Sequence, residues 1–89
     1  MARFLVQYHF AVSRWEKMRR NPQDWRIEDV EVVANRLDIT VHKSGGSHVV
    51  FKHNAATMAV TVPAHRPIKP VYVQQFIKIV NELTGDNDE

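Results

Sequence analysis

The chain contains no cysteine, so neither a disulfide framework nor a metal site built from thiolates is available to it. It also has no apolar run close to the roughly 20 residues that a membrane-spanning helix requires. Gln7 and His9 interrupt the one stretch, residues 4–12, that resembles a signal peptide. Because these absences disfavour secretion and a membrane partner, we expect a cytoplasmic protein.

Several sequence patterns that mark particular classes of protein are also missing. The chain has no low-complexity tract, internal repeat or long charged tail. It has no P-loop, Rossmann fingerprint, serine elbow or paired carboxylates, and we expect no cofactor. The composition, 44% hydrophobic and 25% charged, is that of an ordinary globular protein, and 89 residues suffice for a single domain with a modest core.

Carboxylates are absent from the middle of the chain. Residues 39–70 contain four Lys or Arg side chains, four of the five histidines and no acid, although the net charge of the whole chain is only +2. Residues 1–26 are also basic, with six cations against two acids. An acid-free segment gives a positive surface to whichever face it forms, which favours polyanions as partners. The alternative is a chance distribution of charge in a short protein.

Two segments have the periodicity of helices with one buried face. Over residues 27–37 the apolar residues recur at intervals of three and four, with Asp24 expected to cap the helix and acids in its first turn. A second stripe over residues 70–84 begins at Pro70, which suits the first helical turn, and Gly85 can end it.

Between these helices the apolar period changes to two, which predicts strands over residues 39–43, 47–52 and 57–62. A turn at Ser44-Gly45-Gly46 joins the first two strands, and Pro63 ends the third. We therefore predict an α+β fold of order α-β-β-β-α, with a three-stranded antiparallel sheet and two helices on one face, as in double-stranded-RNA-binding domains. The open face is predicted to carry His42, His48, Val50, Lys52, Ala59 and Thr61.

The start of the chain fits no single pattern, because residues 4–12 alternate like a strand while the positions up to Trp15 also fit a helical face. We expect residues 1–22 to be an extension of uncertain structure, residues 23–85 the domain and residues 86–89 a disordered tail. Trp15 and Trp25 are expected to be packing anchors rather than platforms for bases.

The middle of the chain resembles the HicA family of toxins. Residues 45–53, Gly-Gly-Ser-His-Val-Val-Phe-Lys-His, and residues 59–65, Ala-Val-Thr-Val-Pro-Ala-His, follow that family's pattern of a Gly-Ser-His strand after a glycine turn, a Thr-Val-Pro strand end and a nearby histidine. The resemblance runs from Trp25 to Leu83. It implies a double-stranded-RNA-binding-like fold, metal-independent cleavage of messenger RNA, and neutralisation by a HicB-like antitoxin.

Carried over by position, His48 matches the family's catalytic histidine, and Gly46 and Ser47 match the turn that presents it. The chain departs from the family pattern at Val49, where many members have a second histidine, and at residues 70–73, which replace a Gly-Thr-Leu-like segment. About 20 amino-terminal residues have no family counterpart. These departures bear on substrate contacts more than on the fold.

The chemistry of imidazole supports the same role for His48. Its ordinary pKa, near 6.5, lets imidazole take or give a proton at neutral pH, and RNA supplies its own nucleophile, the 2′-hydroxyl. His42 would lie directly across from His48 if the turn has three residues, while His53 is expected to be structural. The predicted RNA contacts are Lys43, Gly46, Ser47, Lys52, His42, His65 and Lys69.

Two other functions remain open at this point. The same fold suits a non-catalytic module that binds duplex RNA, and a basic face also suits a protein that only binds an acidic partner. A zinc site is a weaker hypothesis, because the spacings between the histidines match no standard ligand pattern. A duplex-binding module needs lysines at the start of its last helix, where this chain has only Lys69.

Overall fold

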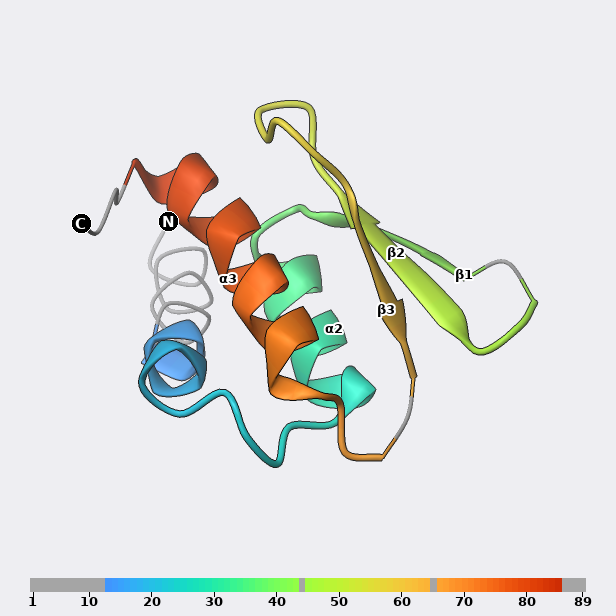
Figure 1. Ribbon diagram of the computed structural model, residues 1–89. Helices are drawn as coiled ribbons and strands as arrows, with labels where there is room; N and C mark the ends of the chain where they lie inside the picture. Colours follow the sequence, from blue (N-terminus) through green and yellow to red (C-terminus); the bar gives the residue numbers. More distant parts are fainter. Residues whose placement is uncertain (1–12, 44, 65, 86–89) are drawn as a thin grey trace.

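The computed structural model describes residues 13–43, 45–64 and 66–85. After a helical segment at residues 13–20 the elements are α2 (Ile27–Arg36), β1 (Thr40–Lys43), β2 (His48–Lys52), β3 (Val60–Pro63) and α3 (Pro70–Thr84) (Figure 1). The strands form an antiparallel sheet in the order β1-β2-β3. The predicted α+β fold with the order α-β-β-β-α is therefore confirmed.

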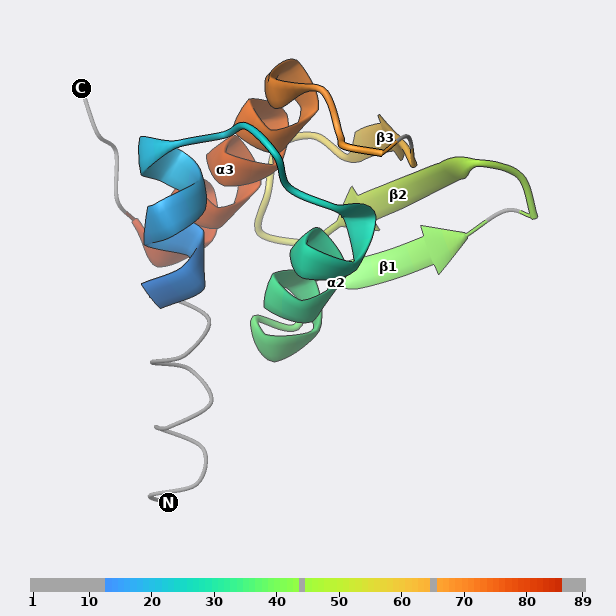
Figure 2. The same cartoon turned by 90° about the horizontal axis from the view of Figure 1, so that it is seen from below.

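Both α2 and α3 lie on one face of the sheet, α2 against β1 and α3 against β3 (Figure 2). The sheet residues that face them are buried, and the Phe51 ring meets the Phe76 ring edge to face at a centroid distance of 5.2 Å. Apolar residues of both helices complete this core. No helix of residues 13–43, 45–64 and 66–85 lies over the other face of the sheet (Figure 2).

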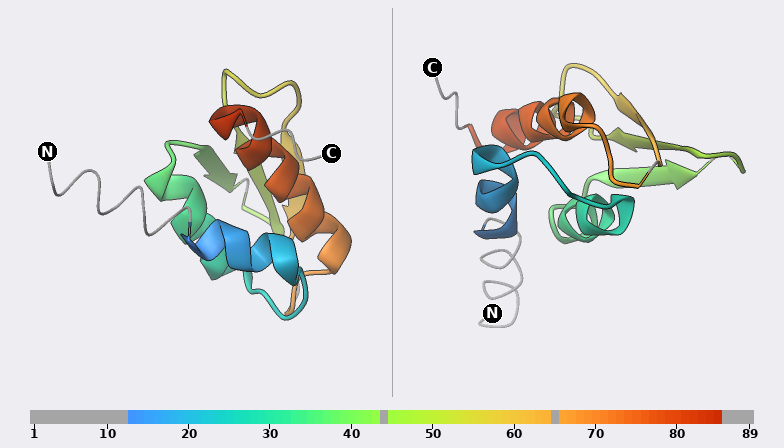
Figure 3. Two further views of the ribbon diagram at one scale, coloured as in Figure 1. Left: turned by 90° about the vertical axis from the view of Figure 1, so that its left-hand side faces the viewer. Right: turned by 60° about the horizontal axis from the view of Figure 1, so that its bottom comes forward.

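The helical segment 13–20 lies on the side of α2 and α3 that faces away from the sheet (Figure 3). It contributes Trp15 and Met18, whose exposed fractions are 3% and 0%, to the same core. The prediction that Trp15 is a packing anchor is confirmed, and Trp25 packs half-buried against the core. No helix among the described residues has the length and apolarity needed to cross a membrane.

The predicted ends of α3 are confirmed, whereas the predicted cap of α2 is wrong. α3 begins at Pro70 and ends before Gly85, whose φ of 73° is the left-handed conformation that glycine adopts readily. α2 is capped at Arg26, whose backbone N–H donates to Asp29 Oδ2 at 3.0 Å. Asp24 lies two residues earlier with a φ of 66°. The side-chain bond at the start of α2 therefore comes from Asp29 inside the first turn, which reaches back to the N-cap residue, and not from Asp24.

The register of the β1–β2 hairpin corrects a second prediction. A turn of three residues would pair Lys43 with Ser47, but Lys43 pairs with Val49, two positions further along the chain. His42 consequently pairs with Val50 rather than with His48. A shift of two residues leaves every side chain on its original face. The alternation of apolar residues therefore fits both registers equally well.

The third strand begins later than predicted, at Val60. The backbone N–H of Thr57 donates to Glu82 Oε1 of α3 at 2.7 Å, which directs this part of the chain toward the helix instead of the sheet. Met58 is consequently 73% exposed, and Ala59 precedes the strand instead of lying on the open face. These departures leave the pairing of β2 with β3 intact.

Candidate active site

The face of the sheet that points away from the helices carries two histidines and a lysine. Alternation along the paired strands places on this open face Thr40, His42, His48, Val50, Lys52, Thr61 and Pro63. All three strands come from residues 39–70, which contain no acid, so the open face has no carboxylate of its own. A positive charge on this face therefore has no anionic neighbour within the sheet.

His48 combines an exposed side chain with a fixed backbone. It is the first residue of β2 and lies opposite Pro63 of β3. Because Pro63 has no N–H, the next donor along the chain is Ala64, whose N–H bonds to the carbonyl oxygen of Ser47 at 2.6 Å. The sheet thus holds the backbone on both sides of the imidazole, and the imidazole itself is open to solvent.

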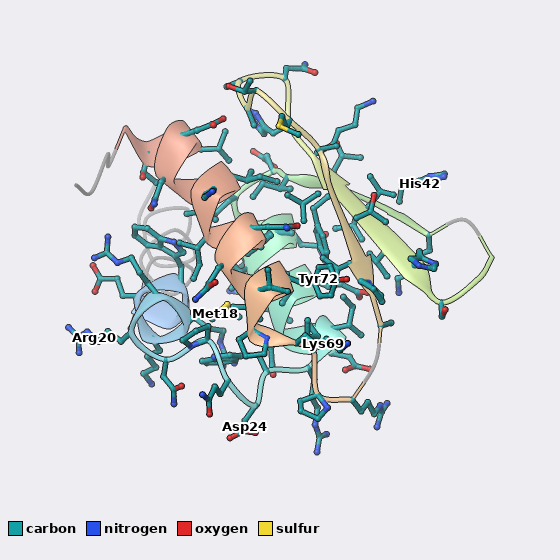
Figure 4. All side chains as sticks on the ribbon, in the orientation of Figure 1. Met18, Arg20, Asp24, His42, Lys69 and Tyr72 are labelled. Carbon is teal, nitrogen blue, oxygen red and sulfur yellow. The ribbon has the colours of Figure 1, made fainter. Side chains whose placement is uncertain are left out.

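His42 is the nearest histidine in register. It points away from the helices (Figure 4) and pairs with Val50, two positions from His48 on the same face. Diagonal neighbours of this kind have Cα atoms about 7–8 Å apart. The register therefore places the two histidines at neighbouring positions of the same face.

Lys52 lies on the open face at the opposite end of β2. It lies four positions after His48, which at a rise of about 3.3 Å per residue is about 13 Å along the strand. Its flexible side chain is exposed. An extended ligand would therefore contact Lys52 and His48 with different parts of its length.

Lys43 and Lys69, two predicted RNA contacts, lie apart from this group. Lys43 is on the helix-facing side of β1, where its Nζ lies 3.2 Å from Glu31 Oε2 of α2. Lys69 is at the start of α3, on the helix side of the sheet (Figure 4). Gly46 and Ser47 are exposed in the connection before β2, and His65 lies outside the described residues.

His53 has the structural surroundings that were expected of it. It is half-buried just after β2, and its Nδ1 accepts the backbone N–H of Ala55 at 3.0 Å. Among the described residues, no group of three or more His, Cys, Asp or Glu side chains is arranged to hold a metal ion. His42, His48 and His53 thus do not converge on one point.

The fold also brings together cations that sequence reasoning did not assign to the site. Arg66, just beyond the strand that pairs with His48, lines a hollow of about 320 Å³ together with Arg26 and Asp24. Sequence reasoning had identified residues 1–26 as basic but had no way to place them. The bond between the Ile68 N–H and the Trp25 carbonyl oxygen, which joins the two segments, has no side-chain signal in the sequence.

A comparison with protein families identifies one family over most of these elements. The family model described as HicA toxin of bacterial toxin-antitoxin matches residues 27–81. A search of curated proteins and a search of solved structures each found no match. The matched residues run from the start of α2 through the whole sheet into α3 and include His48, whereas the helical segment 13–20 precedes them.

Proposed function

The chain belongs to the HicA toxin family of bacterial toxin–antitoxin systems, and from this premise we propose that it is an endoribonuclease that cleaves messenger RNA through His48. The family makes the chain the toxin of such a pair, with a cognate antitoxin as its partner. The observation that carries the chemistry is the exposed imidazole of His48 on a face without carboxylates. An RNA phosphate can approach that imidazole without meeting a negative charge from the sheet.

The reaction requires proton transfer and no nucleophile from the protein. The 2′-hydroxyl of RNA loses its proton to a base and attacks the adjacent phosphorus, while the bond from phosphorus to the 5′-oxygen breaks and that oxygen gains a proton from an acid. The products are a 2′,3′-cyclic phosphate and a 5′-hydroxyl. His48 acts as the base toward the 2′-hydroxyl or as the acid toward the leaving oxygen.

His42 is the second proton-transfer group in this proposal. Its diagonal position leaves about 7–8 Å between the two Cα atoms, which suits a phosphate held between two imidazoles better than a direct bond between them. Lys52 lies about 13 Å from His48, so it binds a neighbouring phosphate rather than the phosphate that reacts. The strand of RNA would therefore run along β2.

A cleavage assay on an RNA oligonucleotide tests the proposal. His48→Ala should keep the fold, because the position is exposed, and should cleave roughly 10²–10⁴-fold more slowly, because one proton transfer is lost. The matched control is His53→Asn, which removes another histidine but keeps an acceptor for the Ala55 N–H. It should cleave like the wild type.

Equal cleavage by the wild type and His48→Ala would overturn the role of His48. RNA binding by the wild type without any cleavage would instead identify the chain as a non-catalytic RNA-binding module. Induced expression gives the matching test in cells, since the wild type should arrest growth and His48→Ala should not.

A further inference from the structure

One loop connects the candidate active site to the segment that precedes α2. At one end of residues 64–69, the Ala64 N–H bonds to the Ser47 carbonyl oxygen at 2.6 Å, next to His48. At the other end, the Ile68 N–H bonds to the Trp25 carbonyl oxygen at 2.9 Å. Ile68 is also buried in the core. The loop therefore holds the segment before α2 in a fixed position relative to the active site (Figure 2).

Cations line two hollows along this connection. The first, of about 320 Å³, is lined by Asp24, Arg26, Arg66 and Pro67. The second, of about 150 Å³, is lined by Ser13, Arg14, Lys17 and Trp25. Trp25 lines the second hollow and Arg26, the next residue in the chain, lines the first. The segment before α2 therefore contributes to both hollows, one shared with Arg66 and the other with the helical segment 13–20.

The charges in these hollows are accessible to an anionic ligand. Lys17 and Arg26 are exposed. Arg66 is held by Glu28 at 3.4 Å, but the two side chains are 71% and 59% exposed, and an ion pair so open to water contributes little. A phosphate can replace Glu28 as the partner of Arg66 at small cost. Asp24 is the one acid among the residues that line the two hollows.

We propose that RNA extends from His48 across a basic track, defined as Arg66, Arg26 and Lys17, so that its phosphates bind the segment that precedes the family-matched residues 27–81. The inference rests on the proposed function, because it takes RNA as the ligand. Lysine and arginine side chains spaced along a surface can bind successive phosphates of RNA, because the backbone carries a negative charge at every nucleotide. The basic track thus adds affinity for long RNA without taking part in the cleavage reaction.

Salt-dependent binding tests the basic track without any need for cleavage. The probe is a single-stranded oligonucleotide of about 16 nucleotides with 2′-O-methyl groups, which lacks the reacting hydroxyl. Lys17→Gln and Arg66→Gln should each reduce the slope of log affinity against log salt by about 0.7. Between 50 and 200 mM salt, the wild type should then lose about 2.6-fold more affinity than either variant, and about sevenfold more than the double variant.

The matched control is Lys78→Gln, which removes the same charge from an exposed position of α3 that lines a different hollow. Its salt slope should equal that of the wild type. A probe of about four nucleotides placed at His48 should not distinguish Lys17→Gln from the wild type, because it is too short to reach the helical segment. Thermal unfolding confirms that each variant is folded.

The outcomes separate this inference from the proposed catalysis. Reduced slopes for Lys17→Gln and Arg66→Gln support the basic track even if unmodified RNA is not cleaved, in which case only the catalytic proposal is lost. Slopes equal to that of Lys78→Gln overturn the track even if His48 proves catalytic. Failure of the wild type to bind the probe also overturns the track. If Lys17→Gln and Arg66→Gln lose antitoxin binding while their RNA binding is unchanged, the cations belong to a protein partner and the track is overturned as well.

Discussion

His42 and His48 lie on adjacent strands, two register positions apart, with no direct hydrogen bond to each other required for the proposed reaction. If one imidazole is the base and the other the acid, their contributions belong to a single step. We expect His42→Ala to slow cleavage, and the double variant His42→Ala/His48→Ala to be hardly slower than His48→Ala alone, because residues that act as a unit are not additive. The measurement is kcat/KM for all four proteins on one oligonucleotide. Fully multiplicative losses would contradict paired action.

These same residues show what sequence alone can establish at this scale. The face on which His42, His48 and Lys52 lie follows from the alternation of apolar residues, and the structure agrees with it. The partner of each residue across the strand does not follow, because a shift of two positions preserves every face. Asp24 illustrates a different limit, since three acids, Asp24, Glu28 and Asp29, lie near the start of α2 and only the structure shows that Asp29 forms the bond.

The helical segment 13–20 is an integral part of the core although it precedes the residues that match the family. Met18→Ala should therefore destabilise the fold by about 2–5 kcal/mol, as for other buried Met→Ala changes. The melting temperature should fall by about 8 °C or more, since 1 kcal/mol corresponds to about 4–8 °C in a domain of this size. Lys17→Ala, at the adjacent exposed position, is the control and should change stability by no more than about 0.5 kcal/mol. Equal melting of Met18→Ala and the wild type would show that the segment does not contribute to the core.

Among the elements, those with one clear period were predictable. α2 and α3 have apolar stripes and distinct ends, and both are present at the predicted places. The segment 13–20 was not predictable, because the strand-like alternation covers residues 4–12 and the helical pattern reaches only to Trp15. Its burial also depends on a surface made by α2 and α3. The start of β3 depends in the same way on a distant residue, Glu82.

For the molecule as a whole, we expect the antitoxin to inhibit most simply by covering the basic open face of the sheet, the same face that RNA is proposed to contact. Lys52→Glu should then weaken the binding of both ligands. For RNA, the salt dependence of affinity should become shallower, and for the HicB-like antitoxin, association should become slower. Lys78→Glu, which makes the same change of charge on α3, controls for net charge. If antitoxin affinity is unchanged while RNA binding collapses, the antitoxin binds elsewhere and does not inhibit by covering the sheet.

The reaction of the whole molecule should also proceed without an added metal. In the proposed reaction the 2′-hydroxyl supplies the nucleophile and imidazoles move the protons, so we expect cleavage in excess EDTA to match cleavage without it. The rates are compared on the same oligonucleotide, with His48→Ala as the baseline for uncatalysed hydrolysis. Loss of activity on chelation that zinc or magnesium restores would require a metal in the mechanism.

The two outer strands have a further consequence for the free toxin. In the part of the chain that the structure describes, the sheet ends at β1 and β3, each of only four residues, and β3 finishes at Pro63, which has no N–H. His42 and Lys43 are exposed on β1. Short strands, a lysine and a proline are features that prevent edge-to-edge aggregation. The toxin should therefore resist strand-by-strand polymerisation with its own copies when it is released from the antitoxin and its sheet is uncovered.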